Sequence, residues 1–87
     1  MKHRFEVIVY LKEGLLDPQG KAIEDALPAL GWTNVSDVRV GKSIQLLIEA
    51  DTEEVAEDQM ADIAHRFLSN PVIERFHIRQ AAEEGGS

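Results

Sequence analysis

The hydrophobic pattern switches repeatedly between two periods along the chain, and the order of these periods restricts the possible folds more than any other feature. Residues 5–11, 35–40, 44–50 and 72–79 alternate apolar with polar side chains or are rich in β-branched residues, which is typical of strands. Residues 18–30 and 52–69 repeat apolar side chains at helical intervals. The predicted order is therefore strand, helix, strand, strand, helix, strand.

The first helix is bounded by residues with strong terminal preferences. Asp17 can accept hydrogen bonds from the free amide groups of a first turn, and Pro18 suits the first helical position because it lacks a donor. We expect Pro28 to shorten the last turn and Gly31 to end the helix in a left-handed conformation. The apolar stripe predicted to face the sheet consists of Ile23, Ala26, Leu27 and Leu30.

Residue parity selects the turn between the second and third strands. A two-residue loop would place Ile44 among charged side chains on one face. A three-residue loop at residues 41–43 instead sets Val38 and Val40 opposite Leu46 and Ile44, which makes one face apolar. The parity therefore predicts a three-residue hairpin with a bulge.

The second helix has the spacing of a capping box at Asp51 and Glu54, and it should end at Asn70-Pro71 because proline pushes the preceding residue out of the helical region. Residues 81–87 lack large apolar groups and are predicted to form a frayed tail after a single domain at 1–80. The apolar residues of the second helix are Ala56, Met60, Ile63, Ala64 and Phe67.

This element order matches the ferredoxin-like, or split βαβ, plan of the α+β class. The prediction is a two-layer sandwich in which an antiparallel four-stranded sheet is covered on one face by two helices. The other face stays open, and it carries apolar side chains among polar ones. We therefore expect a homodimer or higher oligomer, with these oligomer-interface candidates: Ile8, Tyr10, Leu47 and Ile73.

Charge and composition exclude several classes of protein. The net charge is −7, and carboxylates without a single base between Glu49 and Asp62 repel phosphate backbones and anionic lipid. No apolar run approaches the roughly 20 residues that span a bilayer, and the charged first residues do not suit a secretory signal. A chain without cysteine fits a cytoplasmic location. We expect neither nucleic acid nor a membrane as a partner.

Residues that could carry catalysis or bind metal have structural explanations. His3 and His77 have opposite parities in their strands, so the sheet would hold them on opposite faces, and His65 lies on the second helix. The serines lack a glycine-framed elbow, and no loop has the spacing that cradles phosphate. We therefore expect no catalytic residue, no metal and no cofactor bound by this chain, which leaves a binding or assembly role.

Three separated turn segments resemble the PurS family in identity, order and spacing, and the resemblance covers residues 3–79. Pro28 and Trp32 lie outside these motifs. The segments are Leu15-Leu16-Asp17-Pro18-Gln19-Gly20-Lys21-Ala22, Val38-Arg39-Val40-Gly41-Lys42 and Asn70-Pro71-Val72-Ile73-Glu74.

The resemblance implies a role in phosphoribosylformylglycinamidine synthase, an enzyme complex of purine biosynthesis. In the family's complex a glutaminase subunit releases ammonia from glutamine, and a large synthetase subunit uses ATP and Mg²⁺ to activate the formyl amide oxygen of formylglycinamide ribonucleotide. Ammonia then displaces that oxygen to give the amidine. The small subunit is required for assembly, as a dimer or higher oligomer that contacts both larger subunits and helps to contain the ammonia.

The resemblance also implies which residues a partner would contact. Asp17, Pro18, Gln19 and Gly20 form the first turn and helix start, Arg39, Gly41 and Lys42 the hairpin tip, and Asn70 and Pro71 the end of the second helix. Each has a structural role as cap, tight turn or helix terminator. Polar groups at loop ends are also accessible to a partner. The partner-interface candidates are Asp17, Gln19, Gly20, Arg39, Gly41, Lys42 and Asn70.

Two other functions are compatible with the same topology. A ferredoxin-like regulatory domain that binds a small ligand at a glycine-containing loop would also be small and dimeric, and stabilisation by free amino acids or nucleotides would identify it. An acylphosphatase-like enzyme needs an anion-binding loop with an arginine after the first strand. Residues 11–15 supply no arginine there and add the carboxylate of Glu13, which argues against that enzyme.

Overall fold

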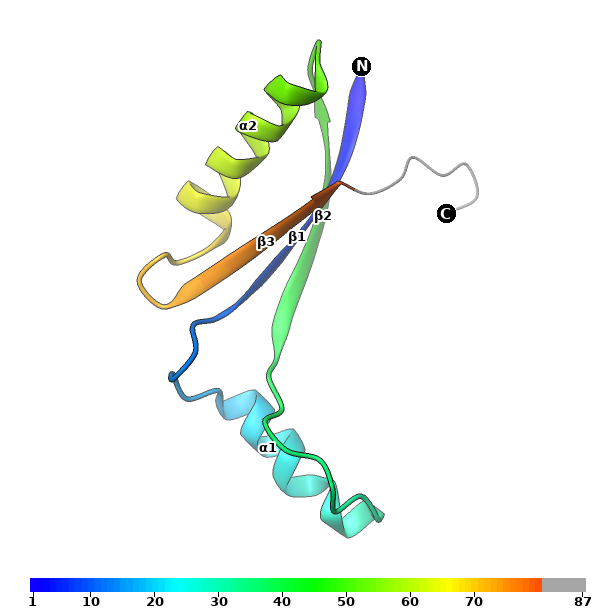
Figure 1. Cartoon of the computed structure of the whole chain (residues 1–87), viewed down its shortest axis with the longest axis vertical. Coiled ribbons are helices and arrows are strands. Elements are labelled where there is room, and N and C mark those ends of the chain that lie inside the picture. Colours follow the sequence, from blue (N-terminus) through cyan, green and yellow to red (C-terminus); the bar gives the residue numbers. More distant parts are fainter. Residues whose placement is uncertain (81–87) are drawn as a thin grey trace.

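The computed structural model describes residues 1–80, and the predicted tail at 81–87 lies outside this range. Three strands and two principal helices follow one another along the chain, with a short helical turn after each helix (Figure 1). The elements are β1 (Lys2–Leu11), α1 (Pro18–Ala26), η1 (Pro28–Leu30), β2 (Gly41–Glu49), α2 (Glu53–Ile63), η2 (Ala64–Leu68) and β3 (Glu74–Gln80).

The sheet is antiparallel with the order β2-β1-β3, so the first strand lies in the centre. Val7 pairs with Ile44 on one side and with Ile78 on the other. Because residues paired across an antiparallel sheet share a face, this register gathers the apolar members of all three strands on one side. The alternation in residues 5–11 predicted this face correctly.

Helix α2 covers that apolar face and forms the core with it. The central strand is fully buried on this side, since Phe5, Val7 and Val9 are at most 1% exposed. We call the opposite side of the sheet, which includes Arg4, Glu6, Ile8 and Tyr10, the open face. The other buried core residues are Ile48, Ala56, Met60 and Ala64.

The predicted fourth strand is absent from residues 1–80. Residues 35–40 form no strand, and Gly41 and Ser43, expected in a hairpin loop, pair with Tyr10 and Ile8 inside β2. The amide groups of the predicted strand are directed to α1 instead of to β2, as described below. Asp37 also has a φ of 55°, which interrupts an extended chain. The sheet therefore has three strands, and the four-stranded prediction is wrong.

The first helix was predicted to cover the sheet, and this prediction is wrong. The helix projects beyond the end of the sheet (Figure 1). We call residues 15–40 the arm. Its predicted inward stripe is largely uncovered, since Ile23 is 47% and Leu30 67% exposed. The local predictions hold, because α1 ends at Ala26 before a short turn that starts at Pro28, and Gly31 closes this turn with a φ of 107°.

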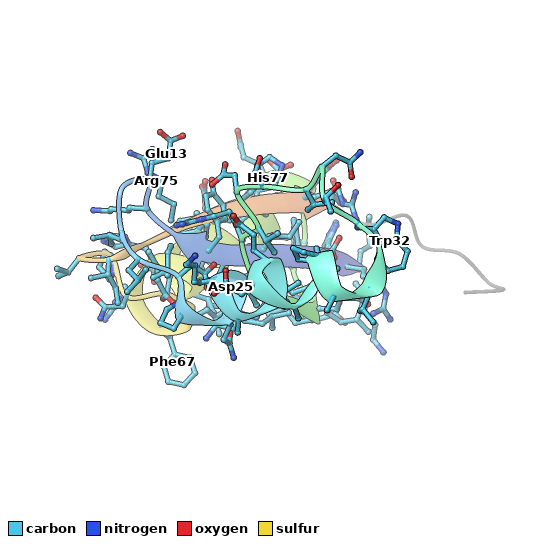
Figure 2. The ribbon with its side chains drawn as sticks, turned by 90° about the horizontal axis from the view of Figure 1, so that it is seen from below. Glu13, Asp25, Trp32, Phe67, Arg75 and His77 are labelled. Carbon is cyan, nitrogen blue, oxygen red and sulfur yellow. The ribbon has the colours of Figure 1, made fainter. Side chains whose placement is uncertain are left out.

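The second helix ends before Asn70-Pro71 as predicted, but its N-cap and the geometry of its last turn differ from the prediction. Its N-cap is Thr52, whose hydroxyl accepts from the Val55 amide, one residue later than the predicted capping box. Its last turn, η2, is a π-helix, and such a turn shifts the inward face by about one residue. Leu68 therefore packs against the core, whereas Phe67 is 83% exposed and points away from the sheet (Figure 2).

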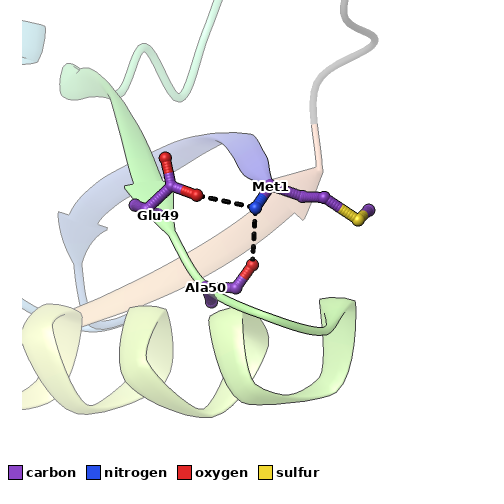
Figure 3. Close-up of polar contacts among 3 residues, drawn as sticks. All are labelled: Met1, Glu49 and Ala50. Carbon is purple, nitrogen blue, oxygen red and sulfur yellow. Dashed lines mark hydrogen bonds and ion pairs between the residues drawn. The ribbon is translucent and has the colours of Figure 1, made fainter.

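The N-terminus fixes the end of the sheet that is remote from the arm. The Met1 ammonium group donates to Glu49 Oε2 at 2.6 Å and to the Ala50 carbonyl at 3.1 Å (Figure 3). The hydrogen bond from this ammonium group lowers the pKa of the Glu49 carboxyl. In residues 1–80, no helix combines the length and the apolar character that crossing a bilayer requires.

Candidate partner-binding site

The three turn motifs converge at one end of the sheet, which we call the motif end. There β1 finishes at Leu11, β2 starts at Gly41 and β3 starts at Glu74. The antiparallel order brings these three positions together, and the Lys12 amide donates to the Ile73 carbonyl at 2.9 Å. Segments more than fifty residues apart in sequence thus form one continuous surface.

Asp17 joins the first motif to the second. Its carboxylate caps α1 by accepting from the Gly20 amide at 2.9 Å, and it accepts from the Val40 amide at 2.7 Å, just before β2. The side chain is buried, at 6% exposure. The hydrogen bonds from Val40 and Gly20, with the nearby Arg39 guanidinium, lower the pKa of Asp17 below its usual 3.8. The carboxylate therefore stays ionised at neutral pH and anchors the arm.

Two glycines of the motifs lie where the backbone leaves no space for a side chain. A Cβ atom on Gly20 would lie 2.1 Å from the Val38 carbonyl oxygen, and one on Gly41 would lie 2.7 Å from that of Val9. Both distances are shorter than van der Waals contact, and the obstacle in each case is backbone. These glycines therefore serve packing between α1 and residues 38–40 and between β1 and β2.

Arg39 holds the loop after β1 in place. Its Nη1 donates to the Leu15 carbonyl at 3.1 Å and its Nη2 to the Lys12 carbonyl at 3.4 Å. The guanidinium group thus bridges the two sides of the arm where it leaves the sheet. Two of its five N–H donors hold backbone carbonyl groups of the same chain, which makes Arg39 a positioning residue at the motif end.

Gln19 and Lys42 are two exposed polar side chains of the first two motifs. Both line a cavity of about 310 Å³ between the start of α1 and the ends of the strands. Glu74 and Tyr10 line the same cavity, although neither was among the predicted partner-interface residues. Their contribution depends on the pairing of β1 with β3, which no local pattern specifies.

Asn70 is near the other motifs, but its polar groups are used locally. Its side-chain Oδ1 accepts from the Val72 backbone amide at 3.1 Å, and its backbone N–H donates to Glu74 Oε1 at 2.7 Å. It does not line the cavity that contains Gln19 and Lys42. The structure therefore brings six candidates together and leaves Asn70 at the adjacent turn.

The oligomer-interface candidates lie on or beside the open face. Tyr10, Leu47 and Ile73 are between 39% and 44% exposed, and Ile8 is half-buried. Ile73 lies in the turn before β3 and not in the strand predicted at residues 72–79. A cavity of about 720 Å³ at the edge of this face is lined by Ile8 and Tyr10 together with Asp37 and Arg39.

The open face is also rich in basic groups. Arg75 and His77 point to the side opposite Phe67 (Figure 2), and Arg79 pairs with Glu6. Glu6 accepts a second hydrogen bond from the Ser43 hydroxyl at 2.5 Å, and these two contacts lower the pKa of its carboxyl. This arrangement links all three strands on the open face.

The described residues contain no group of three or more histidine or acidic side chains placed to hold a metal ion. His3 is buried on the core face, at 7% exposure, and its Nε2 has no hydrogen-bond partner among residues 1–80. His77 lies on the opposite face, as its parity predicts. The site thus offers hydrogen-bonding and apolar surface at the motif end and on the open face, which is the chemistry of a binding subunit.

Comparisons with known proteins identify the family of this small α+β binding subunit. Residues 4–82 match the model of the family PurS, phosphoribosylformylglycinamidine (FGAM) synthase. The PurS subunit of this synthase from Mycobacterium leprae is 45% identical over 80 residues, which is 92% of this chain and 98% of that protein. The chain belongs to the PurS family, and it is a subunit of phosphoribosylformylglycinamidine synthase, a ligase.

Solved structures agree with this assignment. PurS of Methanocaldococcus jannaschii, a subunit of formylglycinamide ribonucleotide amidotransferase in the purine biosynthetic pathway, has a TM-score of 0.81 and 34% identity and covers 97% of this chain and 100% of its own. A chain in the structure of PurLQS from Thermotoga maritima has a TM-score of 0.86 and 31% identity, and the match covers 93% of this chain and 99% of that one. The recognition made from the three turn motifs is confirmed.

Proposed function

We propose that this chain is the noncatalytic assembly subunit of the synthase, which bridges the large synthetase subunit and the glutaminase subunit and supports the transfer of ammonia between them. The main support is the convergence of the three motifs at one end of the sheet, with Gln19 and Lys42 exposed there. The structure of PurLQS from Thermotoga maritima contains a similar chain, which supports assembly with larger subunits.

The side chains and loops of residues 1–80 indicate which subunits bind ATP and Mg²⁺. They include neither a cluster of carboxylates for Mg²⁺ nor a glycine-rich loop for phosphate. We therefore assign ATP and Mg²⁺ to other subunits. We also place the complex in the cytoplasm, where a chain without cysteine is suited to reducing conditions.

Containment of ammonia has a physical reason. Free ammonia is protonated at neutral pH and diffuses away before it can attack an activated amide, so an assembly that holds the two active sites together increases productive transfer. We expect this chain to act as a homodimer or higher oligomer in that assembly. A regulatory domain that binds a small ligand is the alternative from topology, and the family comparison does not favour it.

The first test is reconstitution. Glutamine-dependent amidine formation is measured for the purified synthetase and glutaminase subunits with and without this chain, beside gel filtration of the mixture. We expect activity and a co-eluting complex only when the chain is present. Synthesis from added ammonium salt should depend on the chain much less. Unchanged glutamine-dependent activity and separate elution would rule out the proposal.

Matched variants locate the contact surface. Gln19→Ala and Lys42→Ala remove exposed groups at the motif end, whereas Gln59→Ala on α2 and Lys2→Ala at the remote end of β1 remove the same groups elsewhere. Each motif-end variant should weaken complex formation by about 5- to 30-fold, the usual range for an interface anchor, and the controls should not. Equal effects of both pairs would exclude the motif end as the contact surface.

A further inference from the structure

Residues 64–80 differ in charge from the rest of the chain. They include three arginines and two histidines but only one carboxylate, that of Glu74. With the histidines neutral, three arginines against one glutamate give a formal charge of +2, in a chain whose net charge is −7. The segment before them, from Glu49 to Asp62, has carboxylates and no base. Those carboxylates already favour solubility, so solubility does not account for the basic stretch.

The fold gathers part of this basic stretch at the start of β3. Arg75 pairs with Tyr10 and His77 pairs with Ile8, so both basic side chains lie on the open face. Figure 2 shows Arg75 and His77 pointing to the same side of the molecule. Both are exposed. The basic surface is therefore separate from the acidic outer side of α2, which covers the other face of the sheet.

A cavity of about 310 Å³ lies where η2 and the following turn meet the start of β3. His65 from η2 and Arg75 from β3 line it together, beside Tyr10 from the central strand. The cavity shares Tyr10 with the one that contains Gln19 and Lys42, but it includes no residue of the arm. It is thus a second hollow, on the side of the motif end that faces η2 and β3.

The cationic groups of this cavity are not neutralised within residues 1–80. The ion pairs in this part of the chain involve neither His65 nor Arg75. Glu74 is the carboxylate that lines the cavity, and its Oε1 accepts from the Asn70 backbone amide. Glu13 lines the larger cavity on the other side of Tyr10 and not this one. A guanidinium group with five N–H donors is suited to bind a carboxylate from outside the chain.

The third sequence motif lies at this second cavity. Pro71 and Glu74 line it, and Val72 between them is 76% exposed. The Asn70 side chain holds the turn by accepting from the Val72 amide. A subunit that bridges two larger subunits needs two contact surfaces, and Gln19 and Lys42 belong to only one. The motif that those two residues leave out therefore marks the other.

We propose that one of the two larger subunits binds at this second cavity through a segment that carries carboxylate side chains. One carboxylate enters the cavity and pairs with Arg75 beside His65, and an apolar neighbour in the same segment packs against Val72. The positive charge of residues 64–80 attracts such a segment, whereas the acidic side of α2 repels it. The net charge of −7 disfavours nucleic acid at the same surface. This inference rests on the proposed function, because the partner is one of the subunits that the chain bridges.

A matched pair of charge reversals tests the position of this contact. Arg75→Glu changes an exposed residue of the cavity, and Lys2→Glu makes the same change of charge at the remote end of the sheet. Binding of each larger subunit, labelled in turn, is measured by titration in the mixture of all three proteins. We expect Arg75→Glu to weaken binding of one larger subunit at least about tenfold, and Lys2→Glu to change it less than about twofold. Thermal unfolding of each variant checks that the fold is retained.

Two further measurements test the charge of the partner. Glu74→Gln keeps an oxygen for the Asn70 amide but removes the negative charge, so it should tighten binding of the same subunit about two- to fivefold. A variant that only disturbed the fold would not bind more tightly. Raising the salt concentration from about 0.05 M to about 0.5 M should weaken binding of the unmodified chain more than binding of Arg75→Glu.

Several results would overturn the inference. These are equal effects of Arg75→Glu and Lys2→Glu, or weaker binding by Glu74→Gln. A change in the mass of the isolated chain on Arg75→Glu, without a change in subunit binding, would assign the surface to a second copy. Retention of RNA that Arg75→Glu abolishes would assign it to nucleic acid. If the unmodified chain binds neither larger subunit, the proposed function itself fails, whereas binding that Arg75→Glu leaves intact contradicts this inference alone.

Discussion

The arm and the rest of the molecule are each stabilised internally by a different kind of interaction. The three strands and α2, which we call the body, bury seven apolar residues, among them Phe5 and Met60. In the arm only Asp17 and Gly20 are buried. The body is therefore stabilised by apolar packing, whereas the arm is held together internally by hydrogen bonds to two carboxylates and by one close backbone contact. A region of the second kind depends on contacts from outside the chain for much of its stability.

The largest effect is expected in the body. Met60→Ala should lower the free energy of unfolding by about 2–5 kcal/mol, because it removes a fully buried side chain and leaves a cavity. Urea unfolding measures this change. Val55→Ala on the same helix is the control, since Val55 is 52% exposed, and it should cost less than about 0.5 kcal/mol. Equal losses in the two variants would show that α2 does not form the core.

A smaller effect is expected at the root of the arm. Gly20→Ala places a Cβ atom against the Val38 carbonyl and should separate α1 from residues 38–40, at a cost of about 1–3 kcal/mol. Hydrogen exchange measures the result residue by residue. The amides of Val38 and Val40 should lose protection while the amides of β1 keep theirs, and Gln19→Ala should change neither. Loss of protection throughout β1 would mean that arm and body unfold as one unit.

The third effect depends on pH through Asp17. Because folding lowers its pKa below 3.8, the ionised carboxylate stabilises the fold above that pH, and this contribution is lost as the pH falls through the folded-state value. Asp17→Asn keeps one oxygen as the helix cap but replaces the other with an NH2 group, which cannot accept from the second of the Gly20 and Val40 amides. The loss of this hydrogen bond and of the charge should lower Tm at pH 7 by roughly 4–8 °C.

The test compares the Tm of Asp17→Asn with the Tm of the unmodified chain at each pH. Glu6 and Glu49 also have lowered pKa values, so the unmodified chain loses stability in acid for several reasons. The Tm gap between the two proteins should shrink as the pH falls from 3.8 toward the lowered pKa of folded Asp17, where its carboxylate becomes protonated. A gap that stays constant from pH 7 to pH 3 would show that the charge of Asp17 does not anchor the arm.

The sequence predicted the body better than the arm for a physical reason. The face of β1, the cap at Asp17 and the glycine at 31 depend on local periodicity or on terminal preferences, and all three are confirmed. The parity of residues 44–48 correctly shows which side chains of β2 face the core, whereas the strand predicted at 35–40 and its hairpin are wrong. Parity does not show whether Val38 pairs with a strand of the same chain, and here it pairs with none in residues 1–80.

The candidate site was predictable to a similar extent. The motifs identified Asp17, Gly20 and Arg39, but the motifs could not show that Asp17 also binds the Val40 amide or that Arg39 bridges two carbonyl groups. These contacts join residues more than twenty positions apart, and they depend on where the arm leaves the sheet. The spacing of apolar residues also did not predict the π-helical turn, so Phe67 was placed with the apolar residues of the second helix although it is exposed.

The smallest effect is expected at the one polar side chain on the core face. His3 is buried and its Nε2 has no hydrogen-bond partner among residues 1–80, so replacing it by an apolar side chain of similar volume removes a desolvation cost. His3→Leu should raise the free energy of unfolding by about 1 kcal/mol in urea titrations at neutral pH. His77→Gln on the open face should leave it unchanged. A loss of stability in His3→Leu would show that the imidazole has a partner which compensates its burial, and the body would then share the polar character of the arm.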